Sequence, residues 1–380
     1  MTQSNTIGSG VAHGDVLNAL LGVEEGSSLA RLRARRPEAT SHTQGSYRAL
    51  FGESPATAVS PAERLATALG VAALHQEPAL IDHYRARLSA VPGVSEAQIA
   101  GVLRGPDAAG LPARLRAILA HADLLVIRPS AATPADLHTL QAAGLSDPEI
   151  VTVSQLIAFV SFQVRVFVAL ALLRGDDRPA PAQHSGPRDA NTSGFTQAQL
   201  GWAPWIEPFA AADATAEQRA VLPGQRLDSP YFRLLALDPP VLGERTATDM
   251  GIFYTHEGLP RADRELSATV TSRVNGCTYC ASVHSRHAAQ LSHRTDEVQR
   301  SLDEGIGASL DERWRAVTDL AAALTLTPPA ATQAHLKRLR ALGLDELDLL
   351  DAMQSAAFFA WANRLMLTLG EPVPPAGAGG

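Results

Sequence analysis

The chain has very few cysteines and few aromatic residues. Two of its 380 residues are cysteine, and aromatic residues make up 5% of the sequence. The formal net charge is −7, and the charges are scattered without a basic cluster, which argues against nucleic acid or an anionic membrane as a partner. The first ten residues have neither a basic start nor an apolar core, so we expect no secretory signal and a cytoplasmic protein. In that reducing compartment a cysteine pair is typical of redox or metal chemistry, not of a structural disulfide framework.

The sequence has only one hydrophobic run long enough to suggest a membrane span. This run covers residues 156–173, and Gln163 and Arg165 interrupt it near its middle. Polar and charged side chains at that depth are costly in lipid. We therefore predict a buried helix there and no membrane partner.

Apolar residues recur at helical spacing, and no stretch alternates with period two long enough to indicate a strand, so we predict an all-α fold. The expected helices cover residues 14–36, 60–73, 95–103, 111–126, 133–143, 146–173, 231–237, 259–273, 277–291, 311–326, 332–341 and 345–369. Residues 176–200 are rich in Pro, Gly, Ser, Asn and Asp and are predicted to be a linker. This divides the chain into a first domain at residues 1–175, a second at 201–370 and a disordered tail at 371–380.

The two predicted domains share a sequence pattern. A shift of 199 residues places Arg116 on Arg315, Pro129 on Pro328 and Arg165 on Arg364, among other matches. This recurrence predicts two tandem copies of one helical unit. A shift of 201 upstream places His83 on His284, Gln76 on Cys277 and Ala79 on Cys280, so the first copy is predicted to lack the thiols. We expect Arg165 and Arg364 each to pair with a carboxylate inside its unit or at an interface, and a role in a pocket is the alternative.

The two cysteines lie three positions apart in the segment VNGCTYCASVH, with His284 four residues after the second. Asn275 and Gly276 favour the left-handed backbone that ends a helix, so a new helix is expected to begin near Cys277. A thiol at a helix N-terminus has a lowered pKa, and on this argument alone Cys277 is the more acidic thiol. His284 follows Cys280 by one helical turn and could exchange a proton with it.

Glu265 precedes this turn by ten residues. If the two helices fold back on each other at Asn275 and Gly276, Glu265 lies beside His284. A buried carboxylate there could orient the imidazole, which could then take a proton from a thiol.

The pattern E-x11-C-x2-C-x3-H, formed by Glu265, Cys277, Cys280 and His284, resembles the active-site motif of the alkyl hydroperoxidase D family. That family belongs to the carboxymuconolactone decarboxylase-like superfamily, and the stretches 229–236 and 363–364 also resemble its peroxidase-related members. The resemblance covers residues 225–370 well and the first half weakly, as a degenerate copy. One departure is Tyr279, which stands where some members carry a second histidine.

The resemblance implies an all-helical thiol peroxidase that reduces hydroperoxides without a cofactor. Cys280 would attack the peroxide, Cys277 would resolve the sulfenic acid as a disulfide, and Glu265 with His284 would relay protons. A dithiol protein or a small thiol would then reduce the disulfide. By analogy, the chain would form a homo-oligomer, with a trimer favoured.

Other interpretations of the motif remain open. A zinc site would need Cys277, Cys280, His284 and His287, which span about 15 Å of one helix, so no single ion could bind all four and we expect no metal. The cysteines could instead be inert core residues. A lactone decarboxylase-like lyase would use acid and base groups without thiols, and a redox-sensing protein would form the disulfide without turnover.

Several histidines and a tyrosine outside the motif have weaker support as site residues. His287 and His293 have no motif support and are expected to be structural, as is His83 in the first copy. Tyr254 and His256 could line the entrance to the site, because they lie close to Glu265 in the sequence.

Overall fold

The computed structural model describes residues 14–52, 58–184 and 194–374, which form a helical protein with one small sheet. The elements of the N-terminal half (residues 14–184) are α1 (Val16–Leu21), α2 (Ser28–Ala34), α3 (Pro37–Phe51), α4 (Pro61–Leu74), α5 (Pro78–Ser89), α6 (Glu96–Arg104), α7 (Ala113–Ile127), the 3-10 turn η1 (Pro129–Ala131), α8 (Pro134–Ala142) and α9 (Asp147–Arg174). Those of the C-terminal half (residues 194–374) are β1 (Gly201–Pro204), η2 (Ala211–Asp213), α10 (Ala216–Val221), η3 (Gly224–Asp228), α11 (Pro230–Leu235), α12 (Pro239–Phe253), α13 (Arg261–Val274), α14 (Thr278–Ser292), α15 (Thr295–Glu304), α16 (Glu312–Thr325), α17 (Gln333–Ala341), α18 (Glu346–Thr368) and β2 (Gly370–Val373). The predicted all-α fold class is confirmed.

Several helices begin at the predicted capping residues. The hydroxyl of Ser60 accepts a hydrogen bond from the backbone of Glu63, whose carboxylate accepts one from the backbone of Ser60, so α4 starts with a capping box. Pro61 follows in the first turn, where its missing N–H costs nothing. Ser146 and Glu149 form the same arrangement at the start of α9.

Other elements depart from the sequence prediction. The helix expected over residues 14–36 is two helices, because Gly22 adopts a φ of 60° and ends α1. Helices α3, α5, α10, α12 and α15 were not predicted, and α3 and α12 both begin with proline and mix polar residues into their buried surfaces, which obscures the apolar period.

The small sheet was also missed, because its strands are too short to show alternation. β1 pairs antiparallel with β2, so that Gly201 lies opposite Val373 and Pro204 opposite Gly370. This pairing corrects the prediction of a disordered tail from residue 371, since β2 includes residues 371–373, while residues 375–380 lie outside the described part. The predicted linker has no helix or strand in residues 176–184 and 194–200, and its remaining residues are not described.

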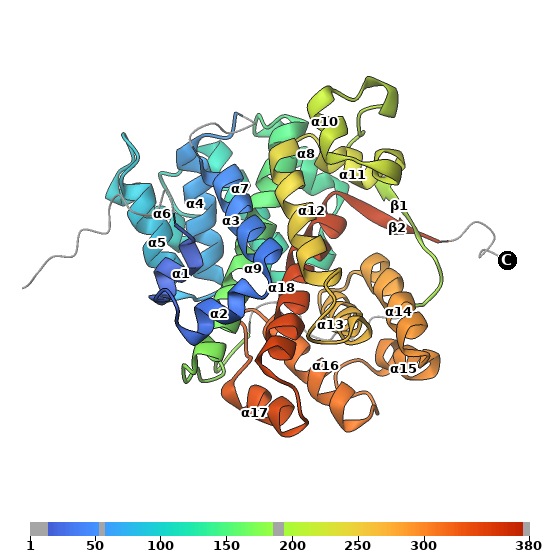
Figure 1. Cartoon of the computed structure of the whole chain (residues 1–380). Helices are drawn as coiled ribbons and strands as arrows, with labels where there is room; N and C mark the ends of the chain where they lie inside the picture. Colours follow the sequence, from blue (N-terminus) through green and yellow to red (C-terminus); the bar gives the residue numbers. More distant parts are fainter. Residues whose placement is uncertain (1–13, 53–57, 185–193, 375–380) are drawn as a thin grey trace, which may run out of the picture.

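Helices α9 and α18 pack against each other at the centre of the molecule, between the N-terminal helices and the group α13 to α17 (Figure 1). Among the described residues, α9 is the one helix that is long and apolar enough to cross a membrane, but 94% of its most apolar window is buried inside the protein. The predicted buried helix is therefore confirmed. One continuous apolar cluster joins the two halves, from Val16 to Leu369.

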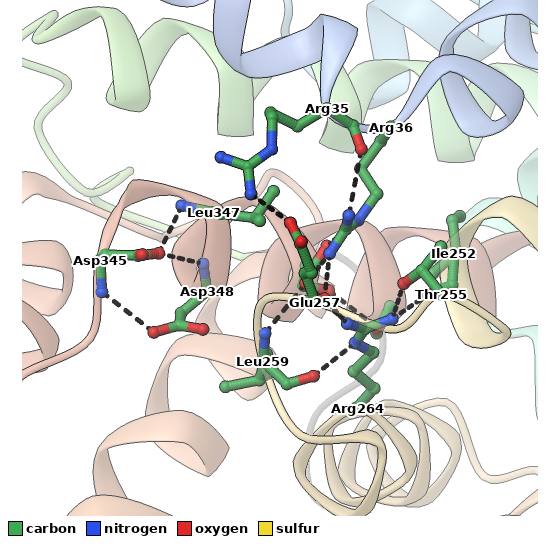
Figure 2. A network of polar contacts seen from close by, with 12 residues as sticks. Arg35, Arg36, Ile252, Thr255, Glu257, Leu259, Arg264, Asp345, Leu347 and Asp348 are labelled. Carbon is green, nitrogen blue, oxygen red and sulfur yellow. Dashed lines mark hydrogen bonds and ion pairs between the residues drawn. The ribbon is translucent and has the colours of Figure 1, made fainter.

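Asp351 on α18 ties the N-terminal half to the start of α13. It accepts hydrogen bonds from Arg36 Nε and Nη2, both at 2.7 Å, and from Arg264 Nη2 at 2.9 Å. The backbone N–H of Leu259 donates to the same carboxylate at 3.0 Å. Figure 2 shows Arg36, from the turn before α3, and Arg264, from α13, converging beside Glu257. These contacts fix the first turn of α13, the helix that carries Glu265.

The helices of the two halves follow the same order at a nearly constant offset. α4 begins at residue 61 and α13 at residue 261, an offset of 200, whereas α9 and α18 begin at 147 and 346, an offset of 199. The Nε atoms of Arg64 and Arg264 also donate, both at 2.8 Å, to the backbone carbonyls of Val59 and Leu259. This recurrence supports duplication, which stays a prediction.

The offset of 200 corrects the predicted alignment of the motif by one residue. The offset changes by single residues along the chain, so one ungapped shift cannot align every helix. The structural counterparts of Glu265, Cys277, Cys280 and His284 are therefore Leu65, Glu77, Leu80 and Tyr84, not the residues reached by a shift of 201.

The expectation that Arg165 and Arg364 pair with carboxylates is wrong. Both side chains are fully buried, and they donate to backbone carbonyls of the opposite half, Arg165 to Thr325 at 2.6 Å and Arg364 to Val126 at 3.3 Å. These carbonyls lie at the C-terminal ends of α16 and α7, where the helix dipole is negative. The helix ends take the place of the expected carboxylates.

Candidate active site

Helices α13 and α14 form a hairpin around Asn275 and Gly276, as predicted. α13 ends at Val274, Gly276 has a φ of 79°, and Cys277 is the N-cap of α14. A Cβ added at Gly276 would stand 2.7 Å from the Cβ of Ser130, so the turn also packs against the N-terminal half. Glycine is required here both for the left-handed backbone and for this close approach.

The hairpin brings Glu265 and His284 together. Glu265 Oε2 lies 2.6 Å from His284 Nδ1, and Arg261 Nε donates to Glu265 Oε1 at 3.0 Å. The Glu265 side chain is 1% exposed, whereas that of His284 is 20% exposed. Because Nδ1 contacts the carboxylate, Nε2 is the nitrogen that remains to exchange a proton with another group.

The two groups stabilise each other's charged forms. Burial acts to raise the pKa of Glu265, but the charge of His284 and its hydrogen bond hold that pKa below its ordinary value. Burial acts to lower the pKa of His284, and the charge of Glu265 outweighs this effect and raises that pKa. The ring of Phe359, with its centroid 4.2 Å from that of His284, packs edge-on against the imidazole.

Both cysteines are free thiols and are buried at the start of α14, with Cys277 1% exposed and Cys280 5% exposed. The two thiols share a hydrogen bond, and the amide of Asn363 on α18 also hydrogen-bonds to each of them. Asn363 is held in place by Ser272 Oγ at 3.0 Å and by Asn275 Nδ2 at 2.9 Å. The thiol pair is therefore fixed by three helices.

The expectation from helix position that Cys277 is the more acidic thiol is wrong. Burial raises the pKa of Cys277 well above its ordinary value, and its hydrogen bond to Cys280 raises it further. Burial also acts to raise the pKa of Cys280, but the hydrogen bond from Cys277 and the charge of His284 bring it below its ordinary value. Cys280, in the first turn of α14, is thus the thiol whose ionisation the surroundings favour.

Helices α11 and α12 add residues that the sequence did not indicate as part of the site. Arg245 on α12 is 5% exposed, and its positive charge lowers the pKa of Cys280, although less than the hydrogen bond from Cys277 does. Asp249 lies one turn later, and burial raises its pKa against the opposing charges of Arg245 and His284. Tyr231 on α11 accepts a hydrogen bond from Arg245 Nη2 at 3.4 Å.

The sequence gives evidence for some of these additional residues and not for others. Tyr231 and Asn363 lie in the stretches 229–236 and 363–364, which resemble peroxidase-related members of the superfamily, so the sequence does contain a signal for them. Arg245 and Asp249 lie on a helix that was not predicted and carried no motif.

The tyrosine and histidines outside the motif lie in different surroundings. Tyr254 is 53% exposed and lies under the guanidinium of Arg261 at 4.0 Å, next to the residue that binds Glu265. His256 is exposed. The ring of His287 lies 6.1 Å from that of His284, and burial lowers its pKa. His293 ends α14 with a φ of 59°.

The corresponding positions in the N-terminal half carry no thiol and no glutamate–histidine pair. Leu65 and Leu80 are apolar there, and Glu77 forms an ion pair with Arg178 at 2.5 Å. The hydroxyl of Tyr84 donates to Gln163. His83 contacts the hydroxyl of Tyr47 at 2.7 Å, and burial lowers its pKa to about 4, so it is neutral and serves packing.

A cavity beside α12 does not contain the thiols. It has a volume of about 530 Å³, lies on the opposite face of α12 from Arg245, and is lined by residues that include Arg226, Met250 and Tyr254. Within residues 14–52, 58–184 and 194–374, no group of three or more His, Cys, Asp and Glu side chains is placed to hold a metal ion.

Comparison with known proteins gives a family match for the hairpin. Residues 239–316, from the start of α12 into α16, match the carboxymuconolactone decarboxylase family. The family segment contains Glu265, both cysteines and His284, and it covers none of the N-terminal half.

Among solved structures, the chain is similar to an uncharacterised peroxidase-related protein from Ralstonia eutropha JMP134, described as an alkylhydroperoxidase AhpD core. The two share 23% identity with a TM-score of 0.37, and the match covers 42% of this chain and 85% of the other. No protein of curated function matches the chain.

Proposed function

We propose that the C-terminal half is a thiol-dependent peroxidase that reduces hydroperoxides through Cys277 and Cys280. The observation that carries the proposal is the hydrogen-bonded thiol pair one turn before His284, which is itself paired with the buried Glu265. This arrangement provides a thiolate, a resolving thiol and a proton carrier within one hairpin. The match of residues 239–316 to the carboxymuconolactone decarboxylase family supports it.

In the first step, the Cys280 thiolate attacks the hydroxyl oxygen of the hydroperoxide. An S–O bond forms, the O–O bond breaks, and the electron pair leaves with the alkoxide. Protonated His284 gives its proton to the alkoxide, so the products are an alcohol and the sulfenic acid of Cys280. The raised pKa of His284, caused by Glu265, keeps that proton available near neutral pH.

In the second step, neutral His284 takes the proton of Cys277, and the resulting thiolate attacks the sulfur of Cys280. The S–S bond forms, the S–O bond breaks, and the departing hydroxide takes the proton from His284 to become water. A raised pKa suits Cys277 to this role, because it remains a thiol and donates to Cys280 until the sulfenic acid has formed.

The disulfide is then reduced by a dithiol protein or a small thiol, which supplies two electrons and two protons. Thiol–disulfide exchange requires direct access to a sulfur atom, and Cys277 is 1% exposed. Reduction therefore requires local opening of the first turn of α14.

A cytoplasmic location and assembly into a homo-oligomer, with a trimer favoured by analogy, remain predictions.

The test is peroxide consumption with a dithiol reductant in wild type, Cys280→Ser and Cys277→Ser. We expect Cys280→Ser to lose turnover, and Cys277→Ser to consume about one equivalent of peroxide and then stop. A dimedone-type sulfenic acid probe should label Cys277→Ser after peroxide, but not wild type, because Cys277 resolves the sulfenic acid. Wild-type turnover in both variants would sink the proposal.

Two other outcomes would point to the alternatives. Retention of a lyase activity in Cys280→Ser would favour a lactone decarboxylase-like function, which uses Glu265 and His284 without thiols. A disulfide that forms with peroxide and never turns over would favour a redox-sensing protein.

A further inference from the structure

Arg261 and His284 share the carboxylate of Glu265. Nε of Arg261 donates to Oε1 of Glu265 at 3.0 Å, while Oε2 of the same carboxylate lies 2.6 Å from Nδ1 of His284. The Glu265 side chain is 1% exposed, whereas those of Arg261 and His284 are 32% and 20% exposed. A buried carboxylate that is bound by a guanidinium on one oxygen and by an imidazole on the other divides its negative charge between them.

Tyr254 holds the guanidinium of Arg261 beside this carboxylate. The central carbon of the guanidinium lies 4.0 Å from the centroid of the tyrosine ring, and the two side chains also share a hydrogen bond. Tyr254 is 53% exposed, so the contacts run from the surface through Arg261 to the buried Glu265. Stacking on the ring and donation to the carboxylate both restrict the guanidinium to this place.

Arg261 stands where a cation is unfavourable for the helix. It is the first residue of α13, and the positive end of the helix dipole lies there. Its hydrogen-bond partners among the described residues are Glu265 and Tyr254, so it connects no elements that are distant in sequence. Arg264, by contrast, is 1% exposed and donates to Asp351 on α18 at 2.9 Å. Arg264 is therefore the arginine that holds the fold, whereas Arg261 acts on the carboxylate.

The N-terminal half contains a counterpart of the structural arginine and no counterpart of the other. At the offset of 200, Arg64 corresponds to Arg264, and both donate from Nε to a backbone carbonyl at 2.8 Å. The residues that correspond to Arg261 and Glu265 at this offset are a proline and a leucine. The pair of Arg261 and Glu265 is thus present in the half that has thiols and absent from the half that has none, which connects it with the chemistry of the site.

The two partners of Glu265 have opposite effects on the proton of His284. Burial acts to lower the pKa of His284, and the charge of Glu265 raises it. Burial acts to raise the pKa of Glu265, whereas the charge and hydrogen bond of His284 and the hydrogen bond from Arg261 lower it. A cation bound to the carboxylate also weakens its attraction for the imidazolium proton. Arg261 thus keeps Glu265 ionised and at the same time limits how tightly His284 holds its proton.

We propose that Arg261 is a positioning residue that binds Oε1 of Glu265 and thereby leaves His284 able both to donate and to accept a proton. The proposed function needs this balance, because His284 gives a proton to the alkoxide in the first step and takes one from Cys277 in the second. The inference deepens that function and rests on it for the role of His284, but the affinity of His284 for its proton can be measured without any peroxide.

The test is an NMR titration of His284 in protein labelled with ¹³C at the imidazole Cε1. The background carries Cys277→Ser and Cys280→Ser, so that no thiolate titrates near the ring, and the signal is assigned by its loss in His284→Gln. The other titratable groups that face the imidazole stay unchanged; they are Asp249 on α12, Glu265 on α13 and His287 on α14.

We expect the neutral variants Arg261→Met and Arg261→Gln to raise the pKa of His284 by about 0.5–1 unit, because the carboxylate then attracts the imidazolium alone. Arg261→Lys keeps a positive charge beside Glu265 and should show less than about half of that shift. In the protein with both thiols, the alkaline limb of the pH–rate profile should move upward in the same order.

Arg315 and Asp319 on α16 provide a matched control. Nε of Arg315 donates to Oδ1 of Asp319 at 2.9 Å with the same spacing of four residues, and the arginine side chain is 35% exposed. Arg315→Met therefore removes an equally exposed cation from a similar pair on another helix, and it should leave the pKa of His284 unchanged. An equal rise in Arg315→Met would overturn the inference, because net charge and not the contact with Glu265 would then set this pKa.

The remaining outcomes separate this inference from the proposed function. The inference is wrong if the pKa of His284 falls or stays constant in the neutral variants, or if it rises as much in Arg261→Lys as in Arg261→Met. Unfolding of both neutral variants, seen by circular dichroism, would also overturn it, because Arg261 would then have a structural role. A raised pKa of His284 in a protein without peroxidase turnover would uphold the role of Arg261 and refute only the proposed function.

Discussion

Arg165 and Arg364 both donate hydrogen bonds across the boundary between the two halves, Arg165 from the N-terminal half and Arg364 from the C-terminal half. Each lies on a central helix of one half and donates to backbone carbonyls at the end of a helix in the other half, Arg165 at α16 and Arg364 at α7. Both are fully buried, and burial lowers the pKa of each guanidinium, that of Arg364 to about 9. The pairing of the halves therefore depends on two buried cations that are held by helix ends.

We expect Arg165→Met to destabilise the protein more than Arg364→Met. Arg165 donates to Thr325 O at 2.6 Å, to Leu326 O at 3.2 Å and to Thr327 Oγ1 at 3.2 Å, whereas the contact of Arg364 across the halves is Val126 O at 3.3 Å. Each buried acceptor left without a donor costs about 1–3 kcal/mol, while removal of an unpaired buried charge returns part of this. The expected net loss for Arg165→Met is about 2–4 kcal/mol.

Urea unfolding of both variants measures this difference, since methionine keeps much of the side-chain volume. Equal urea midpoints for Arg165→Met and wild type would contradict this prediction. They would show that the variant gains as much stability from no longer burying a charge as it loses with the hydrogen bonds to the carbonyls.

We expect Glu265→Gln to affect both stability and activity, with a pH dependence set by the ion pair. The pKa of His284 is raised in the folded state, so its contribution is complete below the ordinary value of 6.5 and is lost as pH rises through the folded pKa. The pKa of Glu265 is lowered, so its contribution is complete above 4.5 and is lost as pH falls through the folded pKa. The loss of stability in Glu265→Gln should therefore be largest between about pH 4.5 and 6.5.

The activity change should follow from the same pair. Without the carboxylate the pKa of His284 falls, less imidazolium is present at neutral pH, and turnover should drop by about 10²–10⁴. A pH–rate profile together with urea unfolding at several pH values measures both effects. Glu257→Gln is the control, because its side chain pairs with Arg35 on the surface, where the two side chains are 73% and 54% exposed. A pH-independent stability difference for Glu265→Gln would contradict the ion pair.

We expect Gly276→Ala to disturb the hairpin more than Gly343→Ala does at the end of α17. Gly276 and Gly343 have φ values of 79° and 87°, so an alanine is strained at both by roughly 1–2 kcal/mol. At Gly343 nothing lies within 4 Å of an added Cβ, whereas at Gly276 the Cβ of Ser130 would be 2.7 Å away.

The difference between the two variants therefore measures contact between the halves at the turn that positions Cys277. Thermal unfolding and peroxide turnover should both be worse for Gly276→Ala, and Ser130→Gly in the same chain should recover part of the loss. If the two alanine variants lose the same stability, the contact with Ser130 contributes nothing.

Most local features of the site could be predicted from the sequence, because they depend on neighbours along the chain. Asn275 and Gly276 end α13 through backbone preferences, and Glu265 then meets His284 because two helices joined by a short turn run antiparallel. The residues that complete the site could not be found in this way. Asn363 and Arg245 come from helices far away in sequence, and α12 begins with two prolines and mixes polar with apolar residues, which hid its helical period.

The motif by itself determined that one thiol pair, one histidine and one carboxylate share a hairpin, since spacing and turn residues fix which side chains lie on facing helices. Only the tertiary structure decided which thiol is the acidic one. Helix position favoured Cys277, but burial raises the pKa of Cys277 and the surroundings of Cys280 lower its pKa. The pKa of a buried thiol depends on desolvation and on charges from packed neighbours, and these come from residues as distant in sequence as Arg245 and Asn363.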